Sequence, residues 1–175
     1  GAESSYAWHN AGTGHAGLCE LNYTPQRPDG SIETSKAIQV NEQFQVTRQF
    51  LSHQVKAGML GAPRTFINST PHMNLVWGDA NVAFLRKRWE ALSASPLFSG
   101  MEFSTDRAQI AKWVPLMMQG RDASLPLAAT RSPLGTDCDW GAVTRQYIAA
   151  LDKQANFKLT TGHEVRSLER NAKGG

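Results

Sequence analysis

The stretch Arg64–Gly78, "RTFINSTPHMNLVWG", decides the fold class of this chain. Residues 64–70 and 72–78 are two short runs rich in β-branched and aromatic residues, and the break between them falls at Thr70-Pro71. Such runs, bounded by turn residues, predict two strands with a break at the proline.

Helices are predicted on both sides of this stretch. Thr34 or Ser35 can cap a long helix that ends near Gly58, because apolar residues recur on one face every three or four positions from Ala37 to Val55. Asp79 can cap a second helix, and Asp106 opens another that Pro115 interrupts. Residues 139–154 predict the last helix.

Further strands are predicted at residues 101–104 and 125–131, and residues 158–170 alternate as a strand pair or one long strand would. Because strands and helices alternate irregularly, the predicted fold is α/β (α+β), with a mixed, partly antiparallel sheet and helices on one side.

Composition narrows the class of protein. The 175 residues are 41% hydrophobic and 19% charged, which is typical of a folded domain, and the net charge of +3 is too small to indicate nucleic-acid binding. The run Arg86–Arg88 lies among apolar residues at helical spacing and is interpreted as a solvated helix face.

Cysteine and histidine usage gives no metal signature. Cys19 and Cys138 form no CxxC pair, so the default is a reduced, intracellular setting. The five histidines share no HxxxH or HxH spacing, so we expect no metal site. The chain starts with Gly-Ala-Glu and ends in "RNAKGG", which suggests an internal part of a longer protein.

The loop Asn10–His15, "NAGTGH", is the first candidate site. Its small residues let backbone N–H groups approach a ligand, and Asn10, Thr13 and His15 add polar side chains. A phosphate, a cofactor ring edge or a carboxylate would fit such a loop. The alternative is a tight structural turn with a hydrogen-bonded histidine.

His72 and Arg131 are two further candidate site residues, and each has a purely structural alternative. His72 follows Pro71 at a predicted strand start and either faces a pocket or is a satisfied core or edge histidine. Arg131, in "TRSPLGTD", suits a carboxylate through its bidentate fork, or else is a surface arginine paired with Asp137 or Asp139.

Several long runs resemble one known family. They are "ESSYAWHNAGTGHAGLCELNYTP" (residues 3–25), "VNEQFQVTRQF", "PRTFINSTPHMNLVWG", "WVPLMMQGRD", "AATRSPLGTD" and "DWGAVTRQ". Together they are similar to the FAD-dependent malate:quinone oxidoreductases over nearly all of residues 3–170. His9 departs from that pattern, because the family has asparagine there.

This resemblance implies an enzyme that oxidises (S)-malate to oxaloacetate through FAD and passes the electrons to a membrane quinone. It also implies a flavin-contacting loop region at residues 1–30, a substrate domain at 31–140 and an incomplete return into the FAD-binding domain at 141–175. A Gly-rich nucleotide fingerprint would lie upstream of this chain.

The resemblance also implies roles for individual residues. His15 and His72 would accept or orient a proton, and Arg131 would bind a substrate carboxylate with Thr136 and Asp137 nearby. The residues implied to contact FAD are Ser4, Ser5, Asn10, Ala11, Gly12, Thr13 and Gly14.

Alternatives remain at this point. The parent protein could be another FAD-dependent 2-hydroxyacid oxidase, and the isolated chain is expected to be a folded but inactive domain that does not retain FAD. The parent is expected in the cytoplasm, peripheral to the inner face of the bacterial membrane. Exposed apolar residues at 155–170 predict self-association of the chain.

Overall fold

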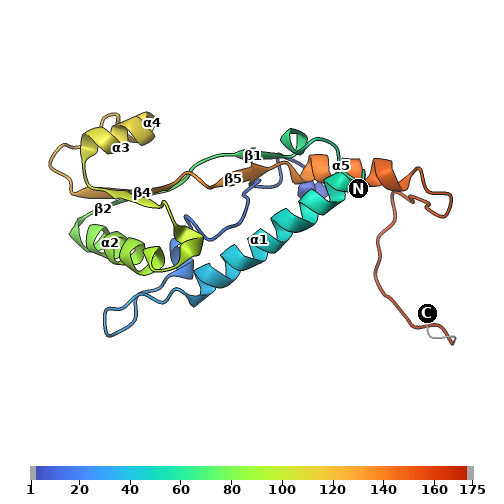
Figure 1. Ribbon diagram of the computed structural model, residues 1–175, viewed down its shortest axis with the longest axis horizontal. Coiled ribbons are helices and arrows are strands. Elements are labelled where there is room, and N and C mark those ends of the chain that lie inside the picture. The colour runs from blue at the N-terminus through green and yellow to red at the C-terminus, as the bar shows by residue number, and fades with distance from the viewer. Residues whose placement is uncertain (1–2, 173–175) are drawn as a thin grey trace.

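The structure is a computed structural model that describes residues 3–172. Its centre is a long antiparallel ribbon, which Figure 1 shows running across the molecule. β1 (Ile67–Ser69) pairs with β5 (Thr136–Cys138), and β2 (His72–Trp77) pairs with β4 (Leu127–Ser132). β3 (Glu102–Ser104) adds a third strand beside β4. Both sheets are antiparallel, and the strands predicted at 72–78, 101–104 and 125–131 are confirmed.

A bulge separates the two halves of this ribbon. Ile67 pairs with Cys138, whereas His72 pairs with Ser132, so residues 70–71 lie opposite residues 133–135. The extra residue on the second strand bends the ribbon, as β-bulges do. Pro71 and Pro133 lie in this segment, where a missing N–H donor costs no ladder hydrogen bond.

Helices cover both faces of the three-stranded sheet, which differs from the expectation of one. α2 (Asp79–Ser93) packs through Leu85 on Val76 and Ala128, and the opposite face packs Leu127 and Ala129 against Ile110. Ile110 belongs to α3 (Arg107–Trp113), which α4 (Pro115–Met118) follows. In Figure 1, α1 and α2 lie on one side of the ribbon and α3 and α4 on the other.

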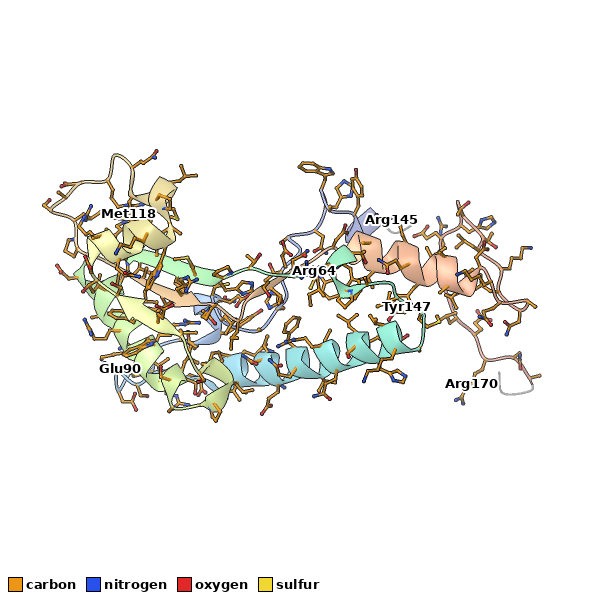
Figure 2. The ribbon with its side chains drawn as sticks, turned by 45° about the horizontal axis from the view of Figure 1, so that its top comes forward. Arg64, Glu90, Met118, Arg145, Tyr147 and Arg170 are labelled. Carbon is orange, nitrogen blue, oxygen red and sulfur yellow. The ribbon has the colours of Figure 1, made fainter. Side chains whose placement is uncertain are left out.

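α1 (Ser35–Lys56) is the longest helix and confirms the predicted periodicity. Its buried residues include Ala37, Phe44 and Leu51. Leu51 packs with Phe66, just before β1, and with Ala142 and Val143 of α5 (Trp140–Leu151). α1 thereby joins the loop region at one end to α5 at the other. Figure 2 shows the two ends of the molecule, with Met118 near one and Arg145 and Tyr147 on α5 near the other.

Four short 3₁₀ helices complete the described elements: Glu3–Ser5, Leu21–Tyr23, Pro63–Thr65 and Pro96–Phe98. The predicted cap at Asp106 is confirmed, because its carboxylate accepts a hydrogen bond of 2.9 Å from the Ala108 N–H. At α1 neither Thr34 nor Ser35 caps through its side chain; Glu33 accepts from the Ser35 N–H instead.

Two further sequence predictions are wrong. Residues 158–170 form neither a strand pair nor a long strand; they are exposed coil, because no neighbouring strand pairs with them within residues 3–172. Arg88 does not belong to a solvated face, since it is fully buried while Arg86 and Lys87 are exposed. Arg88 lies three residues after Leu85 and four before Leu92, which places it on the buried side of α2.

Candidate functional site

The Asn10–His15 loop lies along β5 and continues the sheet. Thr13 forms an antiparallel bridge with Asp137, and the Gly14 N–H donates to the Thr136 carbonyl at 2.9 Å. The Cys138 N–H donates to the Gly12 carbonyl on the other side of this bridge. The loop is therefore held by backbone hydrogen bonds to the strand that carries the predicted substrate residues.

This close approach explains two of the loop's glycines. Gly12 has a φ of +68°, and a Cβ there would lie 3.0 Å from the Cys138 carbonyl oxygen. A Cβ on Gly14 would overlap the Thr136 hydroxyl and lie 2.8 Å from Phe44 Cζ. Both glycines are required by packing against β5 and α1, so their presence alone does not indicate a ligand.

A hollow of about 240 Å³ opens beside the loop, and we call it the loop hollow. One side is formed by Ser5, Ala7 and residues 10–12, and the other by Asn68 and residues 137–140. The structure thus brings together the predicted FAD-contacting residues Ser5, Asn10, Ala11 and Gly12 with the predicted substrate residue Asp137.

Two polar side chains of the loop hollow have structural partners. The Asn10 amide joins the loop to the first helical turn, because its Oδ1 accepts from the Gly12 N–H at 2.8 Å and its Nδ2 donates to the Ser4 carbonyl at 3.3 Å. Asp139 caps α5 by accepting from the Ala142 N–H at 2.8 Å. These contacts fix the walls of the hollow.

The Asp137 carboxylate also lines the loop hollow; it is exposed and has no hydrogen-bond or ion-pair partner among the described residues. Its neighbour Cys138 is buried, and this burial, with a smaller contribution from Asp137, raises the pKa of the Cys138 thiol from 9.0 to about 11. Since the reactive form of cysteine is the thiolate, Cys138 is not a nucleophile at neutral pH.

His72 and Thr136 lie beneath the bulge rather than in the loop hollow. His72 Nε2 lies 3.0 Å from the Thr136 carbonyl oxygen, and Nδ1 is buried with no partner among the described residues. A Cβ on Gly135 would overlap the imidazole, so the turn packs directly on the ring. The Thr136 hydroxyl is buried too. Neither side chain faces the hollow as the structure stands.

Arg131 lies apart from the loop hollow. Its Nη1 donates to Glu102 Oε1 at 2.8 Å, across the β3–β4 pair, and its side chain is 28% exposed. Five residues separate it from Asp137, and residues 133–135 interrupt the strand between β4 and β5. The partner is thus Glu102 rather than Asp137 or Asp139.

His15 lines a second hollow of about 420 Å³, on the side of the loop that faces α1. We call it the aromatic hollow; its walls include His15, Tyr23, Lys36, Val40, Phe44 and Trp140. His15 Nδ1 lies 3.4 Å from Glu20 Oε1, and the ring is tilted against Tyr23 with centroids 5.9 Å apart. The His15 side chain is 52% exposed, so a ligand can reach it.

The predicted site residues therefore separate into four groups. Ser5, Asn10, Ala11, Gly12 and Asp137 surround the loop hollow, and His15 lines the aromatic hollow. Ser4, Thr13, Gly14, His72 and Thr136 support these walls, and Arg131 stands apart. No cluster of three or more His, Cys, Asp or Glu within residues 3–172 could hold a metal ion.

Sequence reasoning missed Asn68 and Trp140 as lining residues. Asn68 is opposite Asp137 in the β1–β5 register, so it could have been found only with the pairing known. Trp140 lines both hollows, which follows from its position at the start of α5. No signal in the sequence indicated this double role.

Comparison with known proteins gives one consistent family. The malate:quinone oxidoreductase (Mqo) family model matches residues 1–175. A probable malate:quinone oxidoreductase of Ralstonia nicotianae is 59% identical over 172 residues, which is 98% of this chain and 32% of the relative. Relatives of the same name from Burkholderia lata and Agrobacterium fabrum are 59% and 58% identical over 98% of this chain, which covers 31% and 33% of their lengths.

The chain spans about a third of the length of the curated relatives it matches. No helix among the described residues has both the length and the apolar character needed to cross a membrane.

Proposed function

Because this chain belongs to the malate:quinone oxidoreductase family, we propose that the whole protein oxidises (S)-malate to oxaloacetate through FAD and passes the electrons to a quinone. The observation that supports this most is the loop hollow, where Ser5 and Asn10–Gly12 face Asp137 across about 240 Å³. In this proposal the loop contacts the cofactor and Asp137 accepts a proton, and both line the same hollow.

The donor set of the loop hollow fits one part of FAD. Ser5, the second N–H of the Asn10 amide and the backbone of residues 10–11 offer neutral hydrogen-bonding groups, as the polar edge of a flavin ring needs. Asp137 and Asp139 also line the hollow and no cation does, so the pyrophosphate does not fit there. The volume is below the roughly 300–1,000 Å³ of ligand pockets, so the hollow takes the ring edge only.

In this proposal the residues of this chain position and deprotonate the substrate, and bound FAD would supply the acceptor for the hydride of malate C2. The exposed Asp137 carboxylate accepts the proton of the C2 hydroxyl. His72 has the orienting role, because its hydrogen bond with the Thr136 carbonyl oxygen holds β5 and hence Asp137 in place. Residues 10–12 exclude water from one side of the reacting centre.

Malate also carries two carboxylates that need cations. Arg131 is the candidate from this chain, but it is paired with Glu102 and distant from Asp137. We therefore propose that Arg131 attracts the anionic substrate towards the ribbon, while cations outside the described residues bind the carboxylates at the hollow. The quinone is lipid-soluble, so we propose a location at the membrane face.

Asp137→Asn in the whole protein is expected to slow flavin reduction by malate about 10²- to 10⁴-fold, because the amide cannot accept the hydroxyl proton. Bound FAD per polypeptide should stay the same, since the loop residues are untouched. Anaerobic stopped-flow absorption of the flavin measures the rate.

The matched control is Asp152→Asn, which removes the same charge at an exposed position at the end of α5. It should reduce the flavin at the rate of the unmodified protein. An Asp137→Asn protein as fast as this control would remove Asp137 from the proposed role.

A further inference from the structure

The aromatic hollow has a chemical character of its own. Tyr23, Phe44 and Trp140 supply aromatic surfaces and Val40 supplies an aliphatic one. The polar groups of the lining come from His15, Lys36, Gln43 and Thr47. No acidic residue lines it among the described residues; Glu20 lies behind His15, at its Nδ1. The volume of about 420 Å³ falls within the range of small-molecule pockets.

Such walls suit a flat, apolar ring that carries carbonyl oxygens. Aromatic side chains pack on planar rings in offset or edge arrangements, and an ammonium or imidazolium donates to a carbonyl oxygen. A dicarboxylic acid would leave most of the apolar wall without a partner. The walls therefore favour a quinone over malate.

The position of the aromatic hollow is the second argument. Trp140 lines both this hollow and the loop hollow, so a ligand in one lies only a side chain away from a ligand in the other. The Asn10–His15 loop also separates the two, with Asn10 and Gly12 on one side and His15 on the other. An electron acceptor bound here would lie next to a flavin ring edge bound there.

We propose that the aromatic hollow is the binding site of the quinone head group and that His15 gives it a proton. This inference rests on the proposed function, which supplies the reduced flavin. The quinone takes two electrons and one proton from the reduced flavin and a second proton from His15, so both C=O groups become C–OH groups. Glu20 Oε1 lies 3.4 Å from Nδ1, which orients the ring and leaves Nε2 to donate.

Two substitutions test binding and proton delivery separately. Val40→Trp fills the aromatic hollow from α1 and is expected to weaken binding of duroquinone, a tetramethyl-benzoquinone, at least 10-fold in equilibrium dialysis against the oxidised whole protein. His15→Gln is expected to slow reoxidation of the reduced flavin by duroquinone about 10²-fold or more. Val40→Trp should leave flavin reduction by malate unchanged.

His53→Gln is the matched control, because His53 is an exposed histidine of α1 outside the aromatic hollow. It should behave as the unmodified protein in both measurements. If Val40→Trp binds duroquinone normally, or if His15→Gln slows reduction by malate instead of reoxidation, the proposal is overturned.

Reduction with dithionite keeps this test independent of the proposed function. Were malate unable to reduce the flavin, the proposed function would fail, yet the chemically reduced protein could still be mixed with duroquinone. A His15→Gln protein reoxidised at the unmodified rate in that experiment contradicts the quinone site itself.

Discussion

Arg88→Ala is expected to lower the free energy of unfolding of this chain by about 3–5 kcal/mol. Arg88 is fully buried on α2, where its Nε donates to the Thr24 hydroxyl at 2.8 Å and its Nη2 to the Leu18 carbonyl at 3.2 Å. Alanine leaves both acceptors without a donor and opens a cavity. Urea unfolding followed by circular dichroism measures the loss.

The charge itself is not the source of this stability. Burial lowers the pKa of Arg88 from 12.5 to about 10, with Cys19 and Glu20 acting in the opposite direction, so the fold disfavours the charged form. Nη1 has no hydrogen-bond partner among the described residues. What Arg88 contributes is volume and two hydrogen bonds that hold residues 18–24.

The control for Arg88→Ala is Arg88→Met, which keeps most of the volume and removes the hydrogen bonds and the charge. We expect it to cost about 1–3 kcal/mol, less than alanine, because only the unsatisfied acceptors remain as a penalty. A loss of under about 1 kcal/mol for Arg88→Ala would show that the Leu18–Thr24 segment does not depend on the guanidinium.

Gly14→Ala is expected to lower the free energy of unfolding by about 2–3 kcal/mol. A Cβ there overlaps the Thr136 hydroxyl and lies 2.8 Å from Phe44 and 2.9 Å from the Thr136 carbonyl oxygen. The loop must therefore move away from β5 or α1. The same urea unfolding experiment measures it.

A double-mutant cycle with Thr136→Ala identifies the cause. Removing the hydroxyl relieves the most severe overlap, so the double variant should recover about 1 kcal/mol beyond additivity. Gly58→Ala is the control, since nothing lies within 4 Å of its Cβ and only its φ of +73° opposes the change. Strict additivity of Gly14→Ala and Thr136→Ala would contradict the packing described for this loop.

Local signals in the sequence were enough for the long elements. The apolar period of α1, the strand run of β2 and the cap at Asp106 depend on residues close together in the sequence, and all three are confirmed. The strand prediction for residues 158–170 is wrong because an alternating sequence forms a strand only where a partner strand exists. Strand pairing is a tertiary property.

The prediction that Arg88 lies on a solvated helix face is wrong for a different reason. Charged residues are exposed on average. The position of Arg88 on the helix, between Leu85 and Leu92, indicates burial instead. The hydrogen bonds that satisfy the guanidinium come from Leu18 and Thr24, more than sixty residues earlier in the chain. No local pattern could have indicated them.

The sequence indicates individual candidate residues of the site, but it does not indicate which of them lie together. The loop Asn10–Gly12 and Asp137 come together because residues 12–14 lie along β5. The sequence alone does not predict this pairing. Arg131 was expected beside them, but the bulge and the Glu102 pair place it elsewhere. The presence of two separate hollows on either side of the loop also depends on the tertiary structure.

We propose that the whole protein is a flavoenzyme that takes a hydride from (S)-malate. The most direct measurement is the visible flavin absorption of the whole purified protein, mixed anaerobically with (S)-malate and, in parallel, with (R)-malate and 2-hydroxyglutarate. We predict bleaching by (S)-malate alone, reversed when duroquinone is added. A protein that carries no flavin, or whose flavin 2-hydroxyglutarate bleaches and (S)-malate does not, would contradict it.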